Sequence, residues 1–176
     1  AEVEDLYRPY KPKRKTRASV ARERGLEDLA LALIMQEKTY DPPLLELAER
    51  FVDPEKEVYS VDDAFDGARD IIAEDISDNA EYRKEIRVLT FDYGFITSKL
   101  CGEDKDGTYE MYYDYSEKLT DIPEHRVLAL NRAESREVVR VSIKVDSNII
   151  LNYLFSQVIT EPSSTAYPHV AAAVVD

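Results

Sequence analysis

The sequence predicts a mainly α fold, a helical bundle with a small β element. Apolar residues recur every three or four positions in several segments, which is the period of an amphipathic helix. One segment instead alternates the two classes: Val139, Val141, Ile143 and Val145 are separated by Arg140, Ser142 and Lys144. A period of two is typical of a strand. At 176 residues, the chain can form one domain or two small subdomains with a buried core.

Two helices are predicted between residues 26 and 53. The first covers residues 26–36, where leucine, isoleucine and alanine recur at helical spacing. The second follows Asp41-Pro42-Pro43, in which the aspartate would cap the helix and the prolines would occupy its first positions. Its apolar face would consist of Leu44, Leu45, Leu47, Ala48 and Phe51.

Ser60 marks the start of the most regular helix, because its hydroxyl can cap the N-terminus and two acids follow in the first turn. Gly67 interrupts the apolar face at a propensity cost of about 1 kcal/mol, which predicts close packing of another helix at that point. Asp78 or Asn79 begins a second helix, with Gly94 as its C-terminal cap. The residues expected to face inward are Ala64, Phe65, Ala68, Ile71, Ile72, Ile76, Tyr82, Ile86, Leu89 and Tyr93.

The pattern changes after Gly94. Residues 95–101 form a short β-like run, and with residues 137–145 they would make the small β element. Residues 108–115 contain four tyrosines, and helix and strand both fit there. Further helices are predicted at residues 124–133, after Pro123, and at residues 148–160 and 166–176.

A basic segment, residues 7–25, stands out in an otherwise acidic protein. It holds eight basic residues and one acid, whereas the rest of the chain holds 15 basic and 35 acidic residues, a net charge of −20. Pro9 and Pro12 predict a stiff, extended arm that turns helical only after Thr16 or Ser19. The candidate nucleic-acid-binding residues are Arg8, Lys11, Lys13, Arg14, Lys15, Arg17, Arg22 and Arg24.

Two interpretations of this basic segment remain open. Closely spaced cations with Tyr7 and Tyr10 among them could neutralise phosphates and stack on bases. Alternatively, the segment pairs with the acidic surface of its own protein. The proline-tyrosine pattern favours packing for the tyrosines, and the dense charge of residues 13–17 favours phosphate contact.

No motif of catalysis or metal binding is present in the sequence. The acidic run 103–107 fails as a calcium loop, because Gly102 and Tyr113 occupy the first and last ligand positions. His125 lacks a nucleophile or carboxylate partner in the pattern, and a helix-turn-helix is not specified by the spacing. The lone Cys101 excludes an internal disulfide and is typical of a reducing cytoplasm, where we expect the protein. We therefore expect no enzyme activity, no cofactor and no membrane span.

Several stretches resemble the bacterial Tex family of transcription accessory proteins. They are residues 5–18 and 21–27, Ala64–Ile76, Arg83 with Ile86-Arg87, Tyr113–Glu117 and Ile122–Arg132. The sequence departs from the family pattern at Glu124, where serine is expected, and in the loop 161–165. The resemblance implies a basic extended arm at residues 1–25 that leads into a helix, and a Tex-like helical domain at residues 26–176, within a longer protein.

The resemblance also implies a function. The chain would be a non-catalytic module that contributes to RNA or DNA binding and scaffolds downstream RNase-H-like, helix-hairpin-helix and OB-fold domains. By itself it would bind nucleic acid weakly and non-specifically. The alternative is an acidic protein-interaction scaffold for a basic partner of the transcription or translation machinery. Because residues 148–160 are apolar on several faces, the C-terminal helices are also expected to self-associate when the downstream domains are absent.

Overall fold

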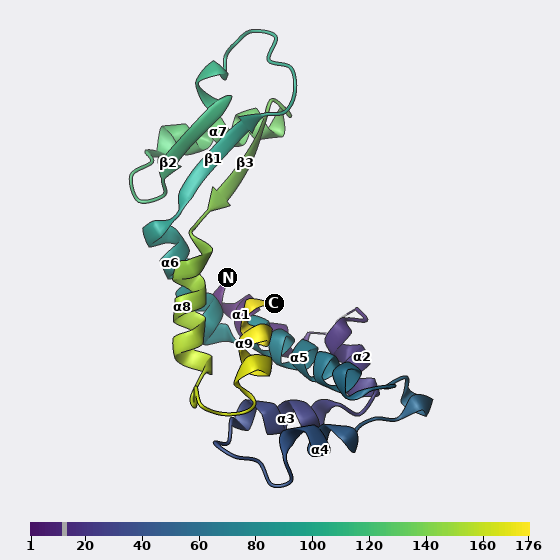
Figure 1. Cartoon of the computed structure of the whole chain (residues 1–176). Helices are drawn as coiled ribbons and strands as arrows, with labels where there is room; N and C mark the ends of the chain where they lie inside the picture. The colour runs from purple at the N-terminus through teal and green to yellow at the C-terminus, as the bar shows by residue number, and fades with distance from the viewer. Residues whose placement is uncertain (12–13) are drawn as a thin grey trace. The chain divides into compact units, whose positions relative to one another are not determined.

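The computed structural model of the chain describes residues 1–11 and 14–176, and it divides into two compact units (Figure 1). The first unit comprises Ala1–Lys84 and Leu151–Asp176, and the second comprises Glu85–Ile150. The first is built from helices, and the second contains a three-stranded sheet. The predicted fold class, mainly α with a small β element, is confirmed.

The helices of the first unit are short apart from one. In chain order they are α1 (Glu2–Tyr7), the 3₁₀ turn η1 (Arg8–Tyr10), α2 (Arg17–Glu23), α3 (Glu27–Met35), α4 (Leu44–Glu49), the 3₁₀ turn η2 (Pro54–Lys56), α5 (Val61–Asp78) and α9 (Tyr167–Val175). Two further helices, α6 (Ala80–Tyr93) and α8 (Ser147–Val158), carry residues of both units. No helix in the described ranges is both long and apolar enough to cross a membrane.

The long helix α5 is the centre of the first unit, and α2, α3, α4 and α9 pack against it. Its predicted apolar stripe is buried from Ala64 to Ile72. Gly67 lies in this stripe, and a Cβ there would overlap Leu26 and lie 3.3 Å from the Ala21 Cβ. The sequence-based expectation of close packing at Gly67 agrees with this geometry.

The start of the chain differs from the predicted extended arm. Arg8 adopts right-handed helical angles (φ −52°, ψ −42°), and η1 continues directly from α1. The proline that follows Arg8 only biases the backbone, and local helical hydrogen bonding overrides that bias here. Lys11 is extended, as predicted. Thr16 caps α2 in a reciprocal capping box with Ser19.

Three other expectations need correction. The cap of α4 is Pro43 rather than Asp41, since the Pro43 carbonyl accepts the Leu47 N–H (3.0 Å) and the helix begins at Leu44. Tyr93, expected to face inward, is 57% exposed. Gly94 ends α6 without a left-handed φ; glycine is needed because a Cβ would collide with the Thr90 carbonyl oxygen.

The sheet of the second unit has the order β2-β1-β3, with both pairs antiparallel. Its strands are β1 (Phe95–Leu100), β2 (Asp114–Lys118) and β3 (Val139–Lys144), and α7 (Glu124–Ser135) packs against it. Strands β1 and β3 confirm the two predicted runs. The ambiguous segment 108–115 forms the 3₁₀ turn η3 (Glu110–Tyr112) and then enters β2.

Candidate nucleic-acid interface

The basic segment packs along an acidic face of α5. Asp66, Asp70, Glu74 and Asp78 follow one another at intervals of four residues, which places them on one side of the helix. This spacing of acids can be read directly from the sequence. It is the signal that identifies where the arginines of residues 7–25 would find partners.

Three arginines of the basic segment bind this acidic face. Arg22 contacts Glu74 (2.7 Å) and the neighbouring Asp75 (2.8 Å), and Thr16 Oγ1 donates to the same Glu74 (3.0 Å). Arg8 Nε donates to Asp78 Oδ1 across 2.9 Å.

Arg17 adds a looser contact to Asp70 (3.5 Å) and a closer one to Asp176 (2.7 Å). Intramolecular pairing therefore applies to the arginines, whereas the sequence favours it for the tyrosines. Tyr7 and Tyr10 are instead exposed.

The remaining candidate residues differ from these three arginines in their ion-pair partners. Arg24 pairs with Glu57 (3.0 Å), and Lys11 lies 4.0 Å from Glu4. Arg14 and Lys15 are exposed, and neither forms an ion pair within the described parts of the chain. Lys13 lies outside the described residues. Free positive charge on the described segment is thus concentrated at Arg14 and Lys15.

Burial affects the charges at this contact. Burial is the largest influence on Asp70 and Asp75 and raises the pKa of each carboxyl, although Arg17 and Arg22 work against the rise. For Arg22, burial lowers the pKa, but the hydrogen bond that Arg22 donates to Glu74 and the nearby carboxylates outweigh it and the net shift is upward. Arg22 therefore stays positively charged while it forms ion pairs with several carboxylates.

The hollow beside this contact has mixed charge. It encloses about 420 Å³, and its lining includes the cations Arg8, Lys11 and Arg14 together with the acids Glu4, Glu74 and Asp78. A phosphate group placed there would meet carboxylates as well as cations. The hollow is therefore a poor phosphate site, and within the described part of the basic segment the exposed Arg14 and Lys15 are the cations that a nucleic acid could contact.

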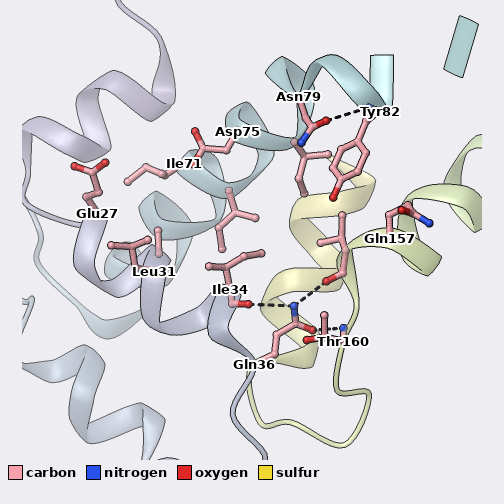
Figure 2. Close-up of a pocket in the computed structure, with 14 residues that line it drawn as sticks. Glu27, Leu31, Ile34, Gln36, Ile71, Asp75, Asn79, Tyr82, Gln157 and Thr160 are labelled. Atoms are coloured by element: carbon pink, nitrogen blue, oxygen red, sulfur yellow. Dashed lines mark hydrogen bonds between the residues drawn. The ribbon is translucent and has the colours of Figure 1, made fainter. Parts of the chain in front are cut away.

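A second hollow of the first unit is mainly apolar (Figure 2). It encloses about 320 Å³ among α3, α5, the start of α6 and the end of α8, with Leu31 and Ile34 on one wall. Glu27 and Asp75 stand at its edge. At its base the Gln36 side chain donates to the Val158 carbonyl (2.8 Å) and accepts from the Thr160 N–H (2.9 Å).

The histidines lie in different settings. His125 is exposed on α7, whereas the His169 ring stacks on Phe65 with centroids 4.0 Å apart. Burial, and then the charge of Arg69, lower the pKa of His169. Within residues 1–11 and 14–176, no group of three His, Cys, Asp or Glu side chains is placed to hold a metal ion.

Comparison with known proteins agrees with the sequence resemblance. The Tex central region-like family matches residues 37–165. The chain is 44% identical to the Bacillus subtilis protein YdcI over 93% of its own length and 23% of that protein. It is 40% identical to Protein tex of Bordetella pertussis (84% of this chain, 18% of that one). It is 33% identical to the Transcriptional accessory protein Tex of Neisseria gonorrhoeae (81% and 18%).

The chain thus spans only about a fifth of the length of these relatives. The match begins before the acidic face of α5 and continues beyond the sheet, so it includes most of both units. The chain belongs to the Tex central region-like family.

Proposed function

We propose that this chain is a non-catalytic helical module of a Tex-like transcription accessory protein. In this proposal it scaffolds RNase-H-like, helix-hairpin-helix and OB-fold domains elsewhere in the protein, in the cytoplasm, and adds weak, non-specific contacts to RNA or DNA. The observation that carries the nucleic-acid contact is the pair Arg14 and Lys15. They are adjacent, exposed and without acidic partners among the described residues, in a chain of net charge −13.

The pairing of the arginines limits which residues can take part. Arg8, Arg17 and Arg22 already bind carboxylates of α5, so a phosphate would have to compete with them. Reversing their charge would disturb the fold as well as any binding. Arg14 and Lys15 can be reversed without breaking an ion pair that the structure describes.

The test is a fluorescence anisotropy titration of labelled single-stranded DNA and RNA with the 176-residue chain. Arg14→Glu combined with Lys15→Glu should weaken binding and reduce the salt slope by about 1.4, at roughly 0.7 for each phosphate contact with a single strand. Lys38→Glu combined with Lys56→Glu is the matched control, because both lysines are exposed in the same unit and the charge change is equal. Equal losses in the two double variants would contradict a specific role for Arg14 and Lys15.

A second candidate function is supported by the hollow of Figure 2. Its apolar walls with Glu27 and Asp75 at the edge suit an amphipathic helix that carries basic residues beside its apolar stripe. In this alternative the chain is an acidic scaffold for a basic partner of the transcription or translation machinery. Arg22 contacts both acids, at 3.7 Å and 2.8 Å, so one cation balances only part of their charge.

Titration with a labelled amphipathic peptide rich in leucine and lysine tests this alternative. Leu31→Arg should abolish binding, because it adds a like charge and removes an apolar wall. Met35→Arg is the control, since Met35 is exposed on the same helix but does not line the hollow. A Leu31→Arg protein that binds as tightly as the control would refute the alternative.

A further inference from the structure

One face of the sheet in the second unit is covered and the other is exposed. Ile96 and Val139 are buried in one cluster with Leu130 and Ala133 of α7. In Figure 1 α7 lies behind the three strands. Because side chains alternate along a strand, Phe95, Thr97 and Lys99 point away from α7 together with their partners on β2 and β3.

The register brings two lysines to either side of an aromatic ring on the exposed face. Phe95 pairs with Lys118 of β2 and with Lys144 of β3. Residues directly opposite each other in an antiparallel pair share a face, so the three side chains form one row. Phe95 is 39% exposed, and both lysines are exposed without an ion pair among the described residues.

A second row at the other end of the strands is also basic. Lys99 pairs with Asp114 of β2 and Arg140 of β3, and its ammonium forms an ion pair with Asp114. Arg140 is exposed, and the described residues give it no acidic partner. The two rows together hold four cations and one carboxylate. This face therefore carries a charge of +3 in a chain whose net charge is −13.

Between the two basic rows lie only small hydroxyl side chains. Thr97 is flanked by Ser116 and Ser142, and Thr97 Oγ1 lies 2.9 Å from Ser142 Oγ. These side chains leave the middle of the face flat, so that a ligand can approach the backbone closely. Their hydroxyls can also donate to phosphate oxygens or to base edges.

We propose that this exposed sheet face binds single-stranded nucleic acid. Neighbouring strands lie about 4.8 Å apart, so the Cα atoms of Lys118 and Lys144 are about 10 Å apart on either side of Phe95. A base stacked on Phe95 would place its flanking phosphates near the two lysines. Arg140 would contact the nucleic acid further along its length. An acidic peptide would satisfy the charges but has no base to stack on the ring. This site is separate from Arg14 and Lys15 and goes beyond the function proposed above.

The test uses the 176-residue chain and fluorescein-labelled oligothymidylate and oligouridylate of about 12 nucleotides, within the usual site size of such surfaces. Lys118→Glu combined with Lys144→Glu should weaken binding at least about tenfold at low salt and lower the salt slope by about 1.4. Lys105→Glu combined with Arg132→Glu applies the same charge change to exposed residues of the same unit, one in a turn and one on α7. The control pair should bind like the parent protein.

Phe95 variants separate stacking from charge. Phe95→Ala should weaken binding of the single strands by at least about fivefold, whereas Phe95→Tyr should retain it. Thermal melts of each variant report folding, and Lys118→Gln with Lys144→Gln replaces the glutamate pair if that pair unfolds.

The sheet proposal is overturned if the control pair loses as much affinity, or if labelled polyglutamate binds as tightly and with the same sensitivity to Phe95→Ala. It is also overturned if only the Arg14 and Lys15 variant loses binding, a result that would leave the proposed function of the basic segment intact. A loss confined to the sheet variants would support the sheet and contradict the basic segment.

Discussion

Arg8 Nε and Asp78 Oδ1 lie 2.9 Å apart and join residues 70 positions apart in the chain. A reciprocal pair lies beside it and joins α6 to α1: Arg83 Nε donates to Asp5 Oδ1 across 2.8 Å. Both carboxylate side chains are nearly buried, at 10% and 7% exposure. Each acid receives an arginine from the opposite segment, and these crossed pairs fix the start of the chain to the junction of α5 and α6.

Loss of the Asp78 carboxylate should destabilise the protein. Asp78→Ala leaves Arg8 without its partner, but Arg8 is half exposed, so we expect a loss of about 1–3 kcal/mol of unfolding free energy rather than the full cost of a buried charge. Chemical denaturation measures it. Asp66→Ala is the control, because Asp66 forms an exposed pair with Arg69 on the same helix and should cost less than about 0.5 kcal/mol. Equal losses of unfolding free energy in the two variants would show that the pair of Arg8 and Asp78 contributes no more than an exposed ion pair.

Larger side chains at Gly67 should lower the melting temperature. A Cβ there would overlap Leu26 Cδ1, and because Leu26 is buried the contact can be relieved only by a shift within the core. Gly67→Leu should cost about 1–3 kcal/mol through overpacking. Gly67→Ala should also destabilise the fold, although the same change in an exposed helix stabilises it. A thermal melt decides, and a raised midpoint for either variant would contradict close packing.

The capping box of α2 should contribute measurably to stability. Thr16 accepts from the Ser19 N–H (3.0 Å), and the Ser19 hydroxyl accepts from the Thr16 N–H (2.8 Å). Thr16→Ala should cost about 1 kcal/mol, and Thr16→Ser should restore most of it. Chemical denaturation of the two variants would show the difference. A Thr16→Ala protein as stable as the serine variant would mean that the cap is not formed.

Stability should fall on mild acidification because of His169. Burial lowers the pKa of His169 in the fold, so below the ordinary histidine pKa of about 6.5 the unfolded chain binds more protons than the folded one. The contribution is fully present above that value and declines as the pH falls toward the folded pKa. His169→Phe should flatten the profile below about pH 6.5. An unchanged profile for His169→Phe would refute the assignment.

Self-association of the C-terminal helices remains a prediction, and the structure limits which surface could mediate it. Val170, Ala173 and Val174 of α9 are buried, and α9 packs on α5, so this stripe is already covered. Association through α9 would then require helix exchange between two copies. Sedimentation at increasing concentration should show growth in mean mass. A strictly monomeric species at hundreds of micromolar would contradict self-association.

Much of the local structure could be predicted from the sequence. Ser60 caps α5, Pro123 precedes α7, and the alternation from Val139 onward forms β3. Such signals depend on residues within a few positions of one another, so the local pattern determines them. The edge strand β2 is not determined by the sequence, because the tyrosine-rich run 108–115 fits either period. Pairing with β1, not the pattern, makes it a strand.

Only the tertiary structure decided which acidic residues pair with the basic ones. The sequence by itself determined that residues 7–25 are basic and that the rest of the chain is acidic. It did not determine that Arg8 and Arg22 bind α5, because those contacts join residues more than 50 positions apart. Nor did it bring Lys118 and Lys144 to either side of Phe95. That arrangement follows from the strand register, which long-range pairing fixes.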